Sequence, residues 1–92
     1  MKIRIHLKIQ GKVQGVFFRD HTVKKAEQLG DIAGYVANNA DGSVDIVAEG
    51  PENKIDDFID RCSSGPSTSE VTKVDVEKYM FTGEFEDFSI RY

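Results

Sequence analysis

Residues 11–19, with the sequence GKVQGVFFR, combine two glycines and an arginine in a pattern that suits anion binding. Gly11 and Gly15 allow backbone conformations that turn successive N–H groups to one concave side. Arg19 stands where a helical pattern begins, and a helix N-terminus attracts negative charge. Backbone amides, a helix N-terminus and a fixed cation together favour a phosphate group as the ligand. We therefore expect residues 11–19 to form a phosphate-binding loop.

The composition limits the function classes that this chain can serve. Its 92 residues suit one small domain spanning 1–92, and its net charge of −4 argues against general affinity for nucleic acid or anionic membranes. An anion site in such a chain must therefore be a specific local arrangement of donors, because the overall surface is not basic. The single cysteine, Cys62, excludes an internal disulfide and indicates a reducing compartment, for which we expect the cytoplasm. No apolar stretch has the length of a signal peptide core or a membrane span, so neither is expected.

The first half of the chain predicts a strand, a helix and a second strand. Apolar and polar residues alternate over residues 2–10, which indicates a strand with one buried face and one solvated face. The helical spacing of Phe18, Thr22, Ala26 and Leu29 predicts an amphipathic helix over residues 19–29 that ends at Gly30. Residues 32–39 predict the second strand, which Gly34 weakens.

The second half predicts a hairpin, a helix and two more strands. Asp41-Gly42 indicates a tight hairpin turn that leads into a third strand at residues 44–48. Pro51 suits the first position of a second helix. Shorter alternating patterns at residues 74–77 and 88–92 predict the last strands. The buried side of the second helix is predicted to consist of Ile55, Phe58, Ile59 and Cys62.

The predicted order of elements is β-α-β-β-α-β with a further short strand at the end. This order predicts an α+β, ferredoxin-like sandwich, in which an antiparallel sheet carries two helices on one face. The polar alternate positions of the first strand fit a sheet whose other face meets solvent. The fold by itself does not indicate an activity, because many unrelated functions use it.

Two motifs resemble the two signatures of the acylphosphatase family. The first comprises residues 11–19, and the second is GYVANNADGSV at residues 34–44, followed by Gly50. The likeness covers nearly the whole chain, because its length and element order also fit the family. The resemblance implies an enzyme that hydrolyses acyl phosphates to a carboxylate and inorganic phosphate, with neither a metal nor a cofactor.

The resemblance also implies roles for individual residues and for partners. Arg19 corresponds to the arginine that binds the phosphate, and Asn38 corresponds to the asparagine that positions the attacking water. The expected substrate is a small acyl phosphate such as acetyl, carbamoyl or glyceroyl phosphate, with phosphate as product or inhibitor. We expect a monomer without nucleic acid or membrane partners. The backbone amides that form the phosphate cradle are expected at Gln14, Gly15, Val16, Phe17 and Phe18.

One departure from the family pattern affects the second motif. Residues 31–33 separate Gly30 from Gly34, which is one residue more than the family usually has there. We expect a turn or a bulge to absorb this residue, because a one-residue slip would turn the Asn38 side chain to the wrong face. A slipped register would present Asn39 instead, on the opposite face.

An asparagine can orient a water molecule but cannot remove its proton. We therefore expect a phosphoryl oxygen of the substrate to accept that proton. His6 and His21 are both expected at the surface without a catalytic role, and Cys62 is expected as a small buried hydrophobe. Phe17 and Phe18 either anchor the loop to the core or contribute one side chain to an acyl pocket. The C-terminal aromatic residues, Phe81, Phe85, Phe88 and Tyr92, are expected to pack in the core and at its edge.

Simpler interpretations stand beside these. Without the second motif, the glycines of the loop would be ordinary turn glycines, and Asn38 would suit the approach to a hairpin equally well. A non-enzymatic anion-binding domain on the same fold is the first rival function, and a hydrolysis assay separates the two. An RNA-binding module is the second rival. Residues 43–49 argue against it, because they carry two acids and none of the stacking aromatics that such a module needs.

Overall fold

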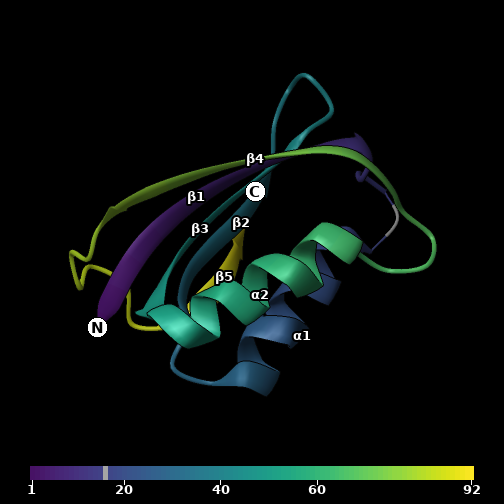
Figure 1. Cartoon of the computed structure of the whole chain (residues 1–92). Coiled ribbons are helices and arrows are strands. Elements are labelled where there is room, and N and C mark those ends of the chain that lie inside the picture. Colours follow the sequence, from purple (N-terminus) through teal and green to yellow (C-terminus); the bar gives the residue numbers. More distant parts are fainter. Residues whose placement is uncertain (16) are drawn as a thin grey trace.

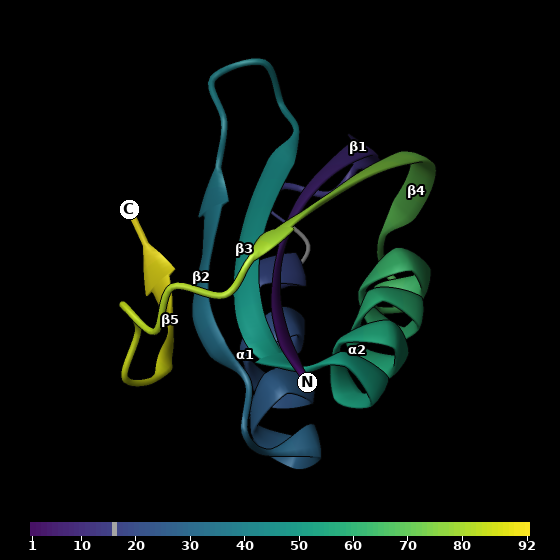
Figure 2. The ribbon, with the colours of Figure 1, turned by 60° about the vertical axis from the view of Figure 1, so that its left-hand side comes forward.

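The computed structural model describes residues 1–15 and 17–92, which form one five-stranded sheet and two helices. Both helices lie side by side on the same side of the sheet (Figure 1), and the turned view in Figure 2 leaves the other face of the sheet open. The ferredoxin-like α+β fold is therefore confirmed. In chain order the elements are β1 (Lys2–Lys12), α1 (Phe18–Leu29), β2 (Ala33–Asn38), β3 (Val44–Pro51), α2 (Glu52–Ser64), β4 (Glu70–Met80) and β5 (Phe88–Arg91).

The strands lie in the order β4-β1-β3-β2-β5. β1 pairs antiparallel with β3 and β4, and β3 pairs antiparallel with β2. β5 pairs parallel with β2, with Val36 opposite Ile90, so the sheet as a whole is mixed. The predicted antiparallel arrangement thus holds for the first four strands, and the fifth strand adds one parallel edge.

The core lies between the sheet and the two helices, as the alternating and helical patterns predict. Phe18, from the first turn of α1, and Phe58, in the middle of α2, are both buried. The Phe58 and Phe88 rings pack edge-to-face, with their centroids 5.6 Å apart. Pro51 ends β3 and is the N-cap residue of α2, one position earlier than predicted. The strand side chains buried in this layer include Ile5, Leu7, Ile9, Val36, Val44, Ile46 and Ala48.

The turn between α1 and β2 absorbs the additional residue. Asp31 has a positive φ of 59°, which is uncommon for a residue with a side chain, and it directly follows Gly30. β2 then starts at Ala33 and pairs with β3 without a register shift as far as Asn38, which lies opposite Val44. β2 therefore carries no register slip, and the Asn38 side chain lies on the same face of the strand as the buried Val36.

Gly34 helps to fix this register. A side-chain Cβ at position 34 would lie 1.9 Å from the carbonyl oxygen of Val47 on the adjacent strand. No substitution with a Cβ can be accommodated there without moving the backbone of β2 away from β3. The glycine that weakens the strand pattern in the sequence is thus the residue that lets the two strands approach.

The β2–β3 hairpin is confirmed, but its loop spans residues 39–43 and is longer than a two-residue turn. The hydroxyl and the backbone N–H of Ser43 both donate hydrogen bonds to the Asp41 carboxylate. These bonds, together with the nearby Lys8 ammonium, lower the pKa of Asp41 to about 2. Asp41 is therefore ionised and holds the loop closed across the neutral pH range.

Glu49 fixes the segment that precedes β5. Its buried carboxylate accepts hydrogen bonds from the backbone N–H groups of Thr82 and Gly83, at 2.9 and 3.0 Å, and from the Thr82 hydroxyl at 2.7 Å. Burial alone would raise the pKa of Glu49, but these bonds and the Arg4 charge bring it below its usual range. The connection between β4 and β5 is thereby attached to β3.

In the part of the chain that the structure describes, no helix has both the length and the apolar character needed to cross a membrane.

Candidate active site

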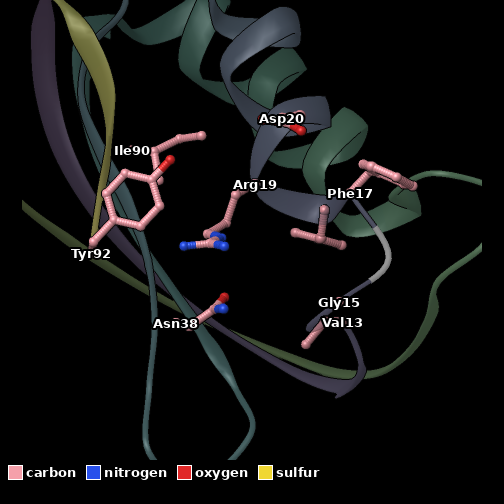
Figure 3. A pocket seen from close by; sticks show the side chains of 9 residues that line it. Val13, Gly15, Phe17, Arg19, Asp20, Asn38, Ile90 and Tyr92 are labelled. Atoms are coloured by element: carbon pink, nitrogen blue, oxygen red, sulfur yellow. The ribbon is translucent and has the colours of Figure 1, made fainter.

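A cavity of about 280 Å³ lies where the N-terminus of α1 meets the end of β2 (Figure 3). Its walls come from the loop after β1, the first residues of α1, Asn38 at the end of β2, and Ile90 and Tyr92. These segments are far apart in the sequence, and the sheet order brings them together. Both residues of the two motifs that carry side-chain chemistry, Arg19 and Asn38, line this cavity.

The start of α1 supplies the cationic side of the cavity. Phe17 is the N-cap residue and provides no side-chain hydrogen bond to the helix, and the first helical bond runs from His21 N–H to the Phe17 carbonyl at 3.0 Å. The amides of the first turn therefore have no capping side chain. Arg19 is the second residue of this helix. A cation at the positive end of a helix is unfavourable unless an anion compensates it.

The Arg19 guanidinium lies 5.1 Å from the centroid of the Tyr92 ring. Within residues 1–15 and 17–92, no carboxylate lies within ion-pair distance of this guanidinium. The donors of Arg19 thus remain available for a ligand, while the aromatic ring holds the side chain in place.

Asn38 reaches the same cavity from the sheet. It shares the helix-facing side of β2 with the buried Val36, two residues earlier, as the period of two requires. Figure 3 shows its amide directed toward the Arg19 guanidinium. The neighbouring Asn39 donates from Nδ2 to the Ser43 hydroxyl at 2.9 Å, so its amide belongs to the hairpin loop.

The residues predicted to form the phosphate cradle, 14–18, have different roles in the structure. Gly15 lines the cavity with a positive φ of 71°, and Val16 lies outside the described residues. The Gln14 side chain is directed elsewhere: Nε2 donates to the carbonyl oxygens of Asn39 and Ser43, at 2.8 and 2.9 Å. Gln14 thereby connects the loop to the β2–β3 hairpin.

The two phenylalanines of the loop lie in different environments. Phe18 is 1% exposed and anchors the loop to the core, whereas the Phe17 side chain is 75% exposed. Both residues line the cavity. The sequence allows each phenylalanine either to anchor the loop to the core or to line an acyl pocket. The structure assigns core anchoring to Phe18, whereas the exposed Phe17 lies at the rim of the cavity.

Three further residues line the cavity that the motifs do not identify, namely Asp20, Ile90 and Tyr92. The expectation that Tyr92 packs at the core edge is wrong, because its side chain is fully exposed and lies against Arg19. The parallel register of β5 with β2 brings the residues after Arg91 alongside Asn38. Asp20 follows Arg19 in the helix, and its carboxylate points away from the guanidinium (Figure 3).

The remaining chemically active residues lie outside the cavity. His6 is half-buried on the open face of the sheet, with Nε2 3.2 Å from Asp45 Oδ1 and Nδ1 3.7 Å from Glu77 Oε1, so it is less solvated than predicted. His21 is also half-buried beside the Phe18 ring. Burial and then the charges of the following lysines lower the pKa of His21.

Cys62 is buried on the apolar side of α2, as predicted, and burial raises the pKa of its thiol. Within the described residues, no group of three or more His, Cys, Asp and Glu side chains has the arrangement of a metal site.

Comparisons with known proteins agree with these features. The family model described as Acylphosphatase matches residues 5–90. The acylphosphatase of Geobacter sulfurreducens is 46% identical over 92 residues, covering all of both chains. The crystal structure of acylphosphatase from Bacillus subtilis superimposes with a TM-score of 0.93 at 36% identity, covering 98% of this chain and 99% of that one. An acylphosphatase structure from Coxiella burnetii gives 0.89 at 37% identity, over 98% and 93% of the two chains. This chain belongs to the acylphosphatase family.

Proposed function

We propose that this protein hydrolyses acyl phosphates to a carboxylate and inorganic phosphate without a metal. The observation that carries the proposal is the meeting of the Arg19 guanidinium, the Asn38 amide and the uncapped amides of α1 at one cavity. Arg19 binds the phosphoryl oxygens with a planar fork of donors that stays charged at any working pH. The loop and helix amides add dipoles that are already oriented before the reaction begins.

Asn38 orients the attacking water toward phosphorus. The water oxygen forms a bond to phosphorus while the bond from phosphorus to the acyl oxygen breaks, and the carboxylate leaves with that electron pair. A phosphoryl oxygen accepts the proton that the water loses, because an asparagine cannot take it. A carboxylate is a good leaving group, so positioning and charge stabilisation carry most of the catalysis.

The proposed substrates are small-molecule acyl phosphates, with inorganic phosphate as product and inhibitor. We further propose that the protein acts as a cytoplasmic monomer without nucleic acid or membrane partners. Its net charge of −4 supports the last part of this proposal, because it disfavours binding to nucleic acid and anionic membranes.

The direct test is hydrolysis of benzoyl phosphate by the purified protein, with and without a chelator. We expect phosphate release well above spontaneous decay and the same rate in both samples. A rate equal to spontaneous decay would disprove the hydrolase. Loss of the rate in chelator alone would leave the hydrolase in place and disprove its metal independence.

The source of the general base can be tested at the two titratable residues nearest to Arg19 along α1. We expect Asp20→Asn and His21→Gln each to keep kcat for acetyl phosphate within about threefold of wild type, since removing a true general base typically costs roughly 10²–10⁴-fold. The Asp20 carboxylate points away from the guanidinium, and the lowered pKa of His21 reflects burial beside a core ring. A hundredfold loss in either variant would replace the substrate oxygen with that residue as the base.

A further inference from the structure

Phe17 combines a strained backbone with an exposed ring. Its φ of 62° and ψ of 22° are left-handed values that a residue with a Cβ adopts only at a cost in free energy. The ring is 75% exposed, so core packing does not offset that cost. Neither the backbone conformation nor the burial explains a phenylalanine at this position, and strain of this kind gathers at sites of function.

A second groove adjoins the cavity at Phe17. It has a volume of about 320 Å³, and its walls are Phe17, Asp20, His21, Lys24 and Pro66. Phe17 and Asp20 line both spaces, so the Phe17 side chain stands at the boundary between them. A ligand held at Arg19 and extending past Phe17 would enter this groove.

The charges at the groove balance one another. Asp20 and Lys24 have opposite charges, and burial, Lys25 and Lys24 lower the pKa of His21, so that its imidazole is neutral at pH 7. Phe17 and Pro66 supply flat apolar surface. The groove therefore selects for apolar contact and offers little attraction to a charged group.

The geometry of the reaction sends the leaving group to this side. In phosphoryl transfer the attacking and leaving oxygens lie roughly in line on opposite sides of phosphorus. Figure 3 shows Asn38, which orients the water in the proposed reaction, and Phe17 on opposite sides of the cavity. Two further lining residues with apolar surface, Ile90 and Tyr92, lie on the Asn38 side.

We propose that Phe17 is the specificity-determining residue for the acyl group and that the site favours acyl phosphates with a flat aromatic acyl group. The acyl group packs against the Phe17 ring and extends into the groove toward Pro66. This inference rests on the proposed function, because it assigns the part of the substrate that the phosphoryl site does not hold.

The test compares benzoyl phosphate with acetyl phosphate in wild type and Phe17→Gly. Glycine tolerates the left-handed backbone, so the variant removes the ring without straining the loop and without adding a side chain that could cap the amides of α1. We expect KM for benzoyl phosphate to rise about tenfold, the scale of discrimination that an apolar contact of this size supports. Because the Phe17 amide also belongs to the expected phosphate cradle, acetyl phosphate kinetics and inhibition by inorganic phosphate are measured on the same preparations to detect any change at the phosphoryl site. Phe17→Leu, which keeps apolar bulk without a flat ring, should give an intermediate benzoyl KM.

Phe81→Ala is the matched control. It removes another partly exposed phenylalanine, which contacts Lys2 and lines neither the cavity nor the groove, so the kinetics of both substrates should stay at wild-type values. The ratio of benzoyl to acetyl kcat/KM, normalised to wild type, cancels the different intrinsic reactivities of the two anhydrides. An unchanged ratio in Phe17→Gly overturns the assignment of Phe17, whether or not both activities fall together. Failure of the proposed function would look different, because wild type would then hydrolyse neither substrate.

Discussion

Replacing Arg19 with glutamine is expected to lower kcat/KM for acyl phosphates by about 10³-fold or more, the scale seen when a charge-stabilising arginine leaves a phosphoryl-transfer site. Glutamine keeps much of the side-chain length but loses the charge and the planar pair of donors. The uncapped amides of α1 remain, so weak phosphate binding should persist. The measurement is steady-state hydrolysis of benzoyl phosphate, with inhibition by inorganic phosphate as the binding readout.

The same variant should remain folded. Removing a cation from the positive end of α1 stabilises the helix by roughly 0.3–1 kcal/mol. Losing the contact between Arg19 and the Tyr92 ring costs about 0.5–1 kcal/mol, so the two effects nearly cancel. Arg61→Gln makes the same change on the exposed side of α2, where Arg61 pairs with Asp57, and it should keep wild-type activity. A folded Arg19→Gln protein with a tenth of wild-type activity would contradict the role of Arg19.

Replacing Asn38 with alanine is expected to lower kcat by about 10²–10³-fold, the usual cost of removing one preorganised polar group from a reacting centre. The inhibition constant of inorganic phosphate should change little, because Arg19 and the amides hold the phosphoryl group in the proposed reaction. Steady-state kinetics and phosphate inhibition on the same preparations give both values.

Asn39→Ala provides the matched control for this variant. It removes the same amide one residue later, where Nδ2 donates to the Ser43 hydroxyl in the hairpin loop. The backbone carbonyl of Asn39, which accepts from Gln14, is unchanged, so activity should stay close to wild type. If phosphate affinity in Asn38→Ala falls in parallel with kcat, Asn38 binds the phosphoryl group and does not act through water.

Much of the fold could be predicted from local patterns. The period of two in β1 follows directly from one buried and one solvated face, and the helical stripe of α1 correctly selects Phe18 and Thr22 as buried residues. The parallel pairing of β5 has no comparable local signal, because a short strand can join either edge of a sheet in either direction. The structure settles this through the register of Val36 with Ile90.

Only part of the candidate site, too, could be predicted from the sequence. The two motifs identify Arg19 and Asn38, and the structure brings both to one cavity. Tyr92 could not be placed from the sequence, because its position beside Arg19 depends on the pairing of β5 with β2. The role of the Gln14 side chain was equally hidden, since its two acceptors are hairpin carbonyls that no side-chain pattern reveals.

The bonds from Gln14 have a consequence for thermal motion. Arg19 and Asn38 both lie at the ends of their elements, where fluctuations are usually largest. The Gln14 side chain, in the loop that leads into α1, donates hydrogen bonds to two backbone carbonyls of the hairpin. These bonds couple the position of the loop to that of the hairpin. A displacement of the hairpin should therefore carry the loop with it, so we expect the distance between the Arg19 guanidinium and the Asn38 amide to change less than the position of either group. Constancy of that spacing is what an in-line displacement demands of its surroundings.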